Sequence, residues 1–280
     1  MRADCHMHMV LDGVEWKAAI GRHSIQPDEG FIRKTLGIYR DLGYTYLRDG
    51  GDRWGVGAKA RELAPEYGIT YRTPLAPLCK AGHYGSFIGT VYNNMKEYAE
   101  LVVKTKARGG NFIKIMISGL MDFDHFGVLT QPGLAPKEIK ELIHIAHAEG
   151  MAVMAHANGA ETVLAAAESG VDSVEHGAYV NDEALWAMKE NSTVWVPTLS
   201  TIGNLRGKGR FSEPDVEKVL ESALQNVGSF HKIGGVLAAG TDAGAWAVPH
   251  GSTTEEEYLA MAGVTETALA NGLSAIKAKF

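Results

Sequence analysis

The chain has 280 residues, of which 45% are hydrophobic and 21% are charged, and its formal net charge is -6. This content is ample for a large core and suits one α/β barrel or two smaller domains. The mild acidity and the absence of a long basic run exclude a typical nucleic-acid binder. No stretch has the length and apolarity of a membrane span or a signal peptide, so we expect no membrane association and a cytoplasmic location.

Short apolar runs alternate with longer segments of helical period along the whole chain. The runs predict eight strands, at residues 2–5, 44–47, 69–75, 111–118, 151–155, 172–175, 193–196 and 235–239. The longer segments predict a helix after each strand, at residues 28–42, 56–67, 92–108, 135–150, 161–169, 182–190, from 212 onward and 255–272. The fourth helix carries a clear apolar stripe, formed by Ile139, Leu142, Ile143 and Ala146. The seventh helix opens with "SEPD", a capping-box pattern that begins at Ser212.

Eight strand–helix units in one chain predict an α/β fold with a parallel sheet that is buried on both faces. Eight units in roughly 250 residues favour a (β/α)₈ TIM barrel. We therefore expect a single domain over residues 1–280. An open, doubly wound sheet is the alternative, but no G-x-G-x-x-G loop follows the first strand to support it.

Six polar residues fall at or near the ends of the predicted strands, where barrel enzymes carry their active sites. On a strand, His6 and His8 point to the same side, as two metal ligands would. The remaining four residues lie on the fourth, fifth, sixth and eighth strands or directly after them: Lys114, His156, His176 and Asp242. Nitrogen and oxygen donors without thiolate suit Zn²⁺, with Mn²⁺, Ni²⁺, Co²⁺ or Fe²⁺ as alternatives.

Lys114 is the unusual member of this set, because a buried ammonium would repel nearby cations. Either it is a core lysine paired with a carboxylate, or CO₂ has converted it to a carbamate that can bridge two metals. The two cysteines, Cys5 and Cys79, do not suggest a disulfide framework.

The metal-ligand pattern resembles that of the amidohydrolase superfamily. Its flanking segments are similar to those of the branch that holds imidazolonepropionase-like and prolidase-like enzymes. The segments are "GYTYLRDGGD", "FIKIMISG", "AHANGAETVLAAAESGVDSVEHGAYV" and "AAGTDAG". The resemblance covers almost the whole chain, and its motifs occur in order on the expected strands.

The resemblance implies two divalent metal ions bridged by carboxylated Lys114. His6, His8 and Asp242 would hold the more buried ion, and His156 and His176 the other. Relatives usually carry a small β-sandwich made from residues before the first strand and after the eighth helix, and we expect it to be absent here. Apolar surface left by its absence would suit a partner subunit, which leaves a homo-oligomer open.

This resemblance favours a hydrolase that cleaves a C–N bond in a small molecule: a dipeptide, an N-acyl amino acid or a cyclic amide. A metal-activated hydroxide would attack the carbonyl, with Asp242 as the proton shuttle and His176 steadying the developing oxyanion. Two alternatives stay open. The same site could open lactones or cleave phosphotriesters and carbamates, and a barrel with this ligand set could bind metal without turnover.

Substrate contacts are less well marked in the sequence. The segment "TLSTIGNLRGKGRFSEP" after the seventh strand is long and glycine-rich, so we expect a loop over the mouth of the barrel. Its Arg206 and Arg210 are candidates for binding a substrate carboxylate, together with Arg48 and His83 closer to the strands. A solvated basic loop that contacts no substrate is the alternative.

Overall fold

The computed structural model describes residues 2–280 and contains the predicted alternation of strands and helices. Its strands are β1 (Arg2–Met7), β2 (Tyr44–Asp49), β3 (Thr70–Arg72), β4 (Leu78–Lys80), β5 (Thr90–Tyr92), β6 (Ile113–Met116), β7 (Val153–Ala157), β8 (Ser173–His176), β9 (Val194–Val196) and β10 (Val236–Leu237). Its helices are α1 (Trp16–Arg22), α2 (Glu29–Asp41), α3 (Val56–Leu63), the 3₁₀ helix η1 (Ala64–Tyr67), α4 (Met95–Ala107), α5 (Pro136–Ala148), α6 (Ala160–Glu168), α7 (Asp182–Glu190), α8 (Ser200–Gly203), α9 (Glu213–Lys232), α10 (Thr254–Met261) and α11 (Glu266–Lys279).

The strands form two parallel sheets. One has the order β1-β2-β3, and the other has the order β10-β9-β8-β7-β6-β4-β5. Backbone hydrogen bonds outside the strand ladders span the gaps between them: for example, the Cys5 amide donates to the Ala239 carbonyl over 2.9 Å, and the Asn111 amide donates to the Thr73 carbonyl over 2.9 Å. The fold is thus mixed α/β with parallel strands, and the strand ladder itself is interrupted at two places.

One interruption has its cause in the third predicted strand. We expected one strand over residues 69–75, but β3 ends at Arg72, and Pro74 and Pro77 follow. Proline lacks the amide hydrogen that a strand interior requires, so pairing stops there. The chain then resumes as β4, which pairs with β6. Where the sequence predicts one third strand, the structure therefore has two short strands, β3 and β4, in different sheets.

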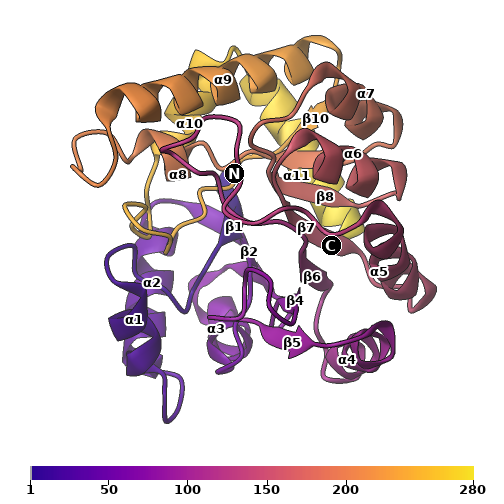
Figure 1. Ribbon diagram of the computed structural model, residues 1–280. Helices are drawn as coiled ribbons and strands as arrows, with labels where there is room; N and C mark the ends of the chain where they lie inside the picture. The colour runs from indigo at the N-terminus through magenta and orange to yellow at the C-terminus, as the bar shows by residue number, and fades with distance from the viewer. Residues whose placement is uncertain (1) are drawn as a thin grey trace.

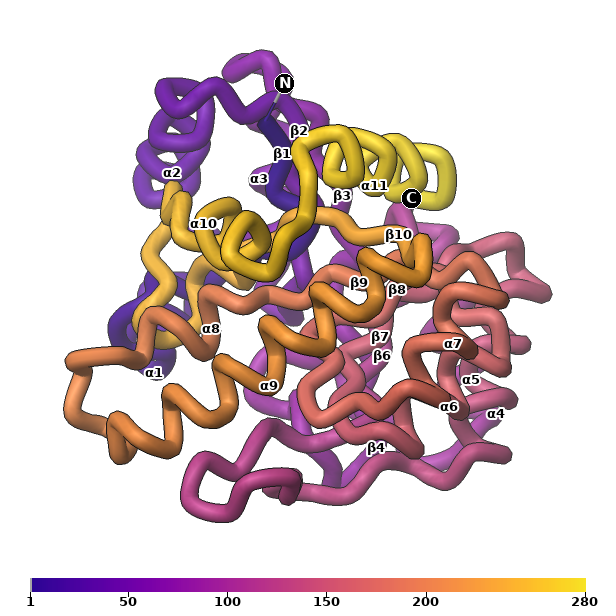
Figure 2. The backbone as a smooth tube through the Cα atoms, turned by 90° about the horizontal axis from the view of Figure 1, so that it is seen from above, coloured from indigo at the N-terminus to yellow at the C-terminus, as the bar shows by residue number. Residues whose placement is uncertain are grey.

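The helices lie around the outside of the strands, as Figures 1 and 2 show. The apolar stripe predicted for α5 is fully buried against the sheet and its neighbouring helices. The end of the strand array opposite the site is closed by α11, where Ile276 and Phe280 pack with Phe112 and Met154 in one buried cluster. Helix α11 thus forms the floor beneath the site.

Three local predictions were wrong. The last helix is not continuous over residues 255–272, because α10 ends at Met261, Gly263 adopts a positive φ of 82°, and the Thr265 side chain caps α11. Ser212 precedes α9, but its side chain makes no capping hydrogen bond. Tyr92 lies in β5 and not in the following helix. Within residues 2–280, no helix is long and apolar enough to cross a membrane.

Candidate metal centre

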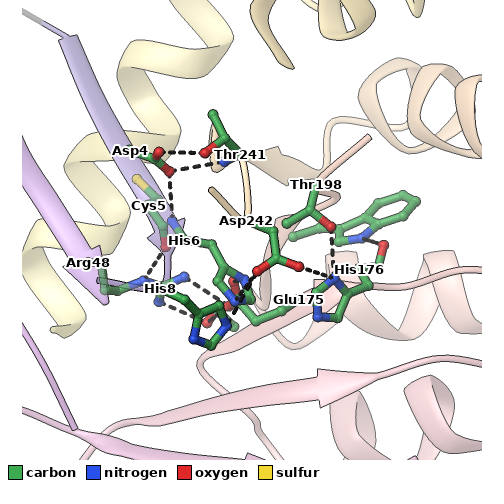
Figure 3. A network of polar contacts seen from close by, with 12 residues as sticks. Asp4, Cys5, His6, His8, Arg48, Glu175, His176, Thr198, Thr241 and Asp242 are labelled. Atoms are coloured by element: carbon green, nitrogen blue, oxygen red, sulfur yellow. Dashed lines mark hydrogen bonds and ion pairs between the residues drawn. The ribbon is translucent and has the colours of Figure 1, made fainter. Parts of the chain in front are cut away.

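The end of the first strand is joined to the segment that follows β10. The Asp242 amide donates to the His6 carbonyl over 2.7 Å, and the His8 amide donates to the Ala243 carbonyl over 2.7 Å. Because His6 and His8 are two residues apart in extended chain, their side chains point to the same side. Figure 3 shows both imidazoles directed toward the Asp242 carboxylate.

These three side chains have the spacing of metal ligands. One nitrogen or oxygen atom from each of His6, His8 and Asp242 lies within 4.8 Å of the others. The Asp242 Oδ1 atom is 3.3 Å from Nε2 of His8 and 3.6 Å from Nε2 of His6. Within residues 2–280, neither this oxygen nor the His6 Nε2 atom has a hydrogen-bond partner, although both are buried. Buried donor atoms without partners that converge on one point fit a divalent cation.

The other three predicted ligands line the same cavity as this cluster. His176 lies between His6 and His156: its ring centroid is 5.1 Å from that of His6 and 4.5 Å from that of His156. Lys114 is 1% exposed, and its Nζ atom has no hydrogen-bond partner in the part of the chain that the structure describes. The structure therefore brings all six predicted ligands to one cavity and places three of them in a single tight cluster.

Burial sets the protonation of these groups. It lowers the pKa of His8 and of His156 to about 3, and it holds the pKa of His6 and of His176 well below the usual 6.5. Neutral imidazole is the form that binds metal. Burial also lowers the pKa of Lys114 to about 8.

Asp242 shows the opposite shift. Burial raises the pKa of its carboxyl group to about 8, while the nearby Lys114 ammonium opposes that rise. A cation among these ligands would favour the ionised carboxylate, since opposite charge stabilises it. The site thus combines neutral histidines with a carboxyl group that is costly to ionise without a positive charge beside it.

The position of His8 depends on a residue with no side chain. A Cβ atom at residue 50 would lie 2.1 Å from the His8 Cε1 atom, so only glycine fits there. Gly50 directly follows β2, and its amide donates to the Met7 carbonyl over 2.7 Å. The "DGG" stretch after β2 is therefore part of the site, although it supplies no ligand atom.

Three residues at the carboxyl ends of neighbouring strands have a left-handed backbone. Their φ angles are 70° for His176, 50° for Thr198 and 57° for Asp242. Non-glycine residues rarely adopt this region, and such strain gathers at functional sites. The Thr198 hydroxyl is 2.8 Å from Nδ1 of His176, so this strained backbone also orients one predicted ligand (Figure 3).

The metal-ligand residues form the base of a cavity of about 640 Å³. Most of its wall is apolar or aromatic. On one side, the ring centroids of Trp16 and Phe87 are 5.6 Å apart, and those of Phe87 and Tyr84 are 5.7 Å apart. On another side, Phe211 stacks on Phe123 with 4.5 Å between centroids. Such a cavity suits a small molecule with a bulky apolar part.

Of the four residues predicted to bind substrate, only Arg210 lines this cavity. Its guanidinium lies over the rings of Trp246 and Phe211, at 4.9 Å and 5.3 Å from their centroids. Arg206 instead forms an ion pair with Glu217, with 2.6 Å between Nε and Oε1. His83 does not line the cavity either.

The prediction for Arg48 is corrected by its burial. Its side chain is 0% exposed, points into the interior beneath the metal cluster, and each of its three guanidinium nitrogens donates to a protein acceptor. Arg48 does not line the cavity, so it is not placed to contact a substrate there.

The aromatic wall was missed by sequence reasoning. Trp16 begins α1, Tyr84 and Trp246 come from two different loops, and no spacing in the sequence connects the three residues. Tyr84 directly follows His83, which we predicted to bind substrate. The prediction therefore identified a loop that lines the cavity, but Tyr84 and not His83 is the residue that lines it.

Known proteins resemble this chain in sequence and in fold. No protein-family model matches the chain. The chain is 26% identical to ochratoxinase of Aspergillus niger over 292 aligned positions, which cover 92% of this chain but only 59% of that protein. It is 25% identical to an uncharacterised protein of Mycobacterium bovis, of which it covers 65%.

Solved structures share the fold. A Xaa-Pro dipeptidase with bound methionine superposes with a TM-score of 0.79 at 22% identity, over 99% of this chain and 75% of that one. The ochratoxinase structure gives a TM-score of 0.78 at 23% identity, over 99% of this chain and 69% of that one.

Fold and site together define an α/β protein with parallel strands and, at their carboxyl ends, a metal-type site of four histidines, one lysine and one aspartate. In fold and sequence, the chain is similar to ochratoxinase and to prolidase-like and other amidohydrolase structures.

Proposed function

We propose that this protein is a metal-dependent hydrolase that cleaves an amide C–N bond in a small molecule. The observation that carries this proposal is the convergence of His6, His8 and Asp242 at the base of an apolar cavity, where the His6 Nε2 and Asp242 Oδ1 atoms lack hydrogen-bond partners among the described residues. The similarity to ochratoxinase supports the same bond type. In this proposal, residues 1–280 are one domain whose strands make up a (β/α)₈ barrel.

Two divalent cations, with Zn²⁺ favoured by the donor set, fit the six ligands. His6, His8 and Asp242 would hold one cation, and His156 and His176 the other. Lys114 would bridge them after its neutral amine adds to CO₂, which forms an N–C bond and releases one proton. This modification would replace an unpartnered buried amine by an anion between two cations.

When bound, the cations would lower the pKa of a water molecule and polarise the substrate carbonyl. The residues of the chain then have distinct tasks. Asp242 accepts a proton at its carboxylate and passes it to the leaving nitrogen. His176, held at Nδ1 by Thr198, stands beside that carboxylate, with 4.0 Å between Nδ1 and Oδ2 of Asp242. The aromatic walls exclude bulk water from the reacting groups.

The lining also supports a substrate class. Arg210 forms no ion pair among those found in residues 2–280, whereas the carboxylate of Glu15, which lines the same cavity, is occupied in capping α1. A guanidinium without an ion-pair partner and aromatic side chains in one cavity suit a dipeptide or an N-acyl amino acid with a free carboxylate. The Xaa-Pro dipeptidase among the structural relatives acts on substrates of that kind by its name.

The test combines metal analysis with a substrate library. Protein purified without chelator, and reconstituted with Zn²⁺ and bicarbonate, should approach two metal equivalents and hydrolyse N-acyl amino acids or dipeptides. A ¹³C-carbamate resonance after labelling with ¹³C-bicarbonate would identify modified Lys114, and a Lys114→Ala variant should lack it.

Each other outcome contradicts a defined part of the proposal. A maximum of one equivalent would refute the binuclear site. Turnover confined to lactones or phosphotriesters would refute the amide substrate. Metal binding without turnover of any amide, ester or phosphotriester would leave a non-catalytic binding protein.

A further inference from the structure

A layer of buried polar side chains lies between the floor of the strand array and the metal cluster. Arg48 comes from β2, and Ser173 and Glu175 come from β8; all three are 0% exposed. Below this layer, the Phe280 ring centroid is 4.4 Å from the Arg48 Cζ atom. Above it stands His6. Neither Arg48 nor Glu175 has been given a part in the proposed reaction.

Arg48 and Ser173 hold one oxygen of Glu175. The guanidinium donates to the Glu175 Oε1 atom over 2.8 Å through Nη2, and to the Ser173 hydroxyl over 2.9 Å through Nη1. The Ser173 hydroxyl in turn donates to the same Oε1 atom over 2.5 Å. The third guanidinium nitrogen, Nε, donates to the Cys5 carbonyl over 2.6 Å. Glu175 is therefore fixed by two donors and neutralised by one buried cation (Figure 3).

The other oxygen of Glu175 is directed at a predicted metal ligand. Its Oε2 atom lies 2.8 Å from Nδ1 of His6. The angle at this contact departs from that of a regular hydrogen bond, and neither atom has another partner in the described chain. An imidazole that gives its Nδ1 hydrogen to a carboxylate keeps the lone pair on Nε2. In His6, Nε2 is the nitrogen that faces Asp242.

We propose that Glu175 is the positioning residue for His6: it selects the tautomer that leaves Nε2 free to bind the cation, and Arg48 fixes Glu175 for that task. This inference rests on the proposed metal site. It assigns a task to the arginine of "LRDGG" and the glutamate of "VEHG". In other metalloproteins, a carboxylate that orients a ligating histidine raises metal affinity by roughly 10–100-fold.

A purely structural ion pair is the competing explanation. Buried ion pairs contribute little net stability compared with apolar residues of the same size, because both charges lose their hydration. A structural pair would also leave no reason for the second carboxylate oxygen to face a histidine that has no other partner at Nδ1. The two explanations differ in what they predict for metal affinity and for the tautomer of His6.

The experiment compares Glu175→Gln with wild type and with a matched control. The control is Asp172→Asn, which removes another largely buried carboxylate just before β8, far from His6 in the contacts that it makes. Zn²⁺ affinity of the metal-free proteins is measured by competition with a chromophoric chelator. The His6 tautomer is read from long-range ¹H–¹⁵N spectra of ¹⁵N-histidine-labelled, metal-free protein, with His6→Asn as the assignment reference.

We expect Glu175→Gln to weaken the tightest Zn²⁺ site by roughly 10–100-fold. Glu175→Gln should also shift His6 away from the Nδ1–H tautomer. Asp172→Asn should lower thermal stability but leave the Zn²⁺ affinity and the His6 tautomer as in wild type. Arg48→Lys keeps the charge but loses the planar set of donors. Its Zn²⁺ affinity should lie between those of wild type and Glu175→Gln. If Glu175→Gln does not fold, Ser173→Ala and Arg48→Lys provide the same comparison.

Two results would overturn the inference: Zn²⁺ affinity within about twofold of wild type in a folded variant, or a metal-free wild-type protein in which His6 carries its hydrogen on Nε2. The tautomer measurement does not require bound metal. A wild-type protein that binds no cation would instead overturn the proposed function.

Discussion

The Tyr84 ring lies against the imidazole of His156, with 4.9 Å between the ring centroids and 35° between the ring planes. Tyr84 thus covers a predicted ligand of the outer cation and also forms part of the cavity wall. Pairs of this kind contribute about 0.5–1.5 kcal/mol beyond the area that they bury. We expect Tyr84→Ala to raise KM and weaken the second metal equivalent by about 2–12-fold, while Tyr84→Phe keeps both. A Phe variant as impaired as the Ala variant would assign the effect to the hydroxyl and not to the ring.

The space for His8 can be tested by adding a single methyl group. Gly50→Ala would place a Cβ atom in the position of the imidazole, so we expect loss of the tightly bound metal without global unfolding. The control is Gly21→Ala in α1, where an added Cβ meets no atom within 4 Å and the backbone is helical. It should be neutral or stabilising by up to about 1 kcal/mol. Normal metal content in Gly50→Ala would show that His8 has another usable position.

Asp242 has two proposed tasks that a single substitution separates. Asparagine can still offer an oxygen to a cation but cannot accept a proton. Asp242→Asn should therefore lower kcat by roughly 10²–10⁴-fold while metal content falls much less. The measurement is turnover per bound metal. An unchanged kcat would move the proton transfer to another group, with His176 as the next candidate.

Arg210 should determine the preference for acidic substrates. Arg210→Met should reduce kcat/KM about tenfold or more for an N-acyl amino acid and much less for its methyl ester. Arg206→Met is the matched control, because Arg206 lies in the same loop but is paired with Glu217. Equal handling of acid and ester by the wild type would argue against any carboxylate contact at this rim.

The environment of Asp172 indicates how acid should affect the stability of the fold. Burial alone would raise the pKa of this carboxyl group, but hydrogen bonds from His147 and from the Val153 amide, together with the Lys279 charge, bring it below the usual 3.8. A lowered pKa in the folded state stabilises the fold above the usual value, and that contribution is lost as the pH falls through the folded-state pKa. Asp172→Asn should cost about 1–3 kcal/mol near neutral pH. It should also flatten the decline of Tm toward about pH 3. A parallel decline in both proteins would contradict this.

The order of strands and helices, and the meeting of six polar side chains in one cavity, could be predicted because each depends on local pattern. Helix α5 follows from its apolar period, and His6 and His8 follow from the alternation of an extended chain. Short elements could not be found this way: β4 and β5 have three residues each and are defined by their partners. Neither could the two helices in residues 254–279, since Gly263 is one glycine among many in this sequence.

Arg48 shows the limit of the same reasoning at the site. Alternation along β2 indicates whether a side chain faces the interior, but its height above the floor depends on how neighbouring strands are staggered. That stagger pairs Arg48 with Arg72 on β3 and places its guanidinium beside Glu175 on β8, below the cavity. The aromatic wall depends in the same way on loops that meet only after the strands have assembled.

The left-handed backbone at His176, Thr198 and Asp242 has a consequence for engineering this protein. Each non-glycine residue held in a sparsely populated region costs of order 1–3 kcal/mol. Replacement by glycine at Thr198 relieves that cost and removes the hydroxyl beside His176 in the same step. A selection for higher melting temperature alone would therefore accumulate changes at these three positions and erode the proposed activity.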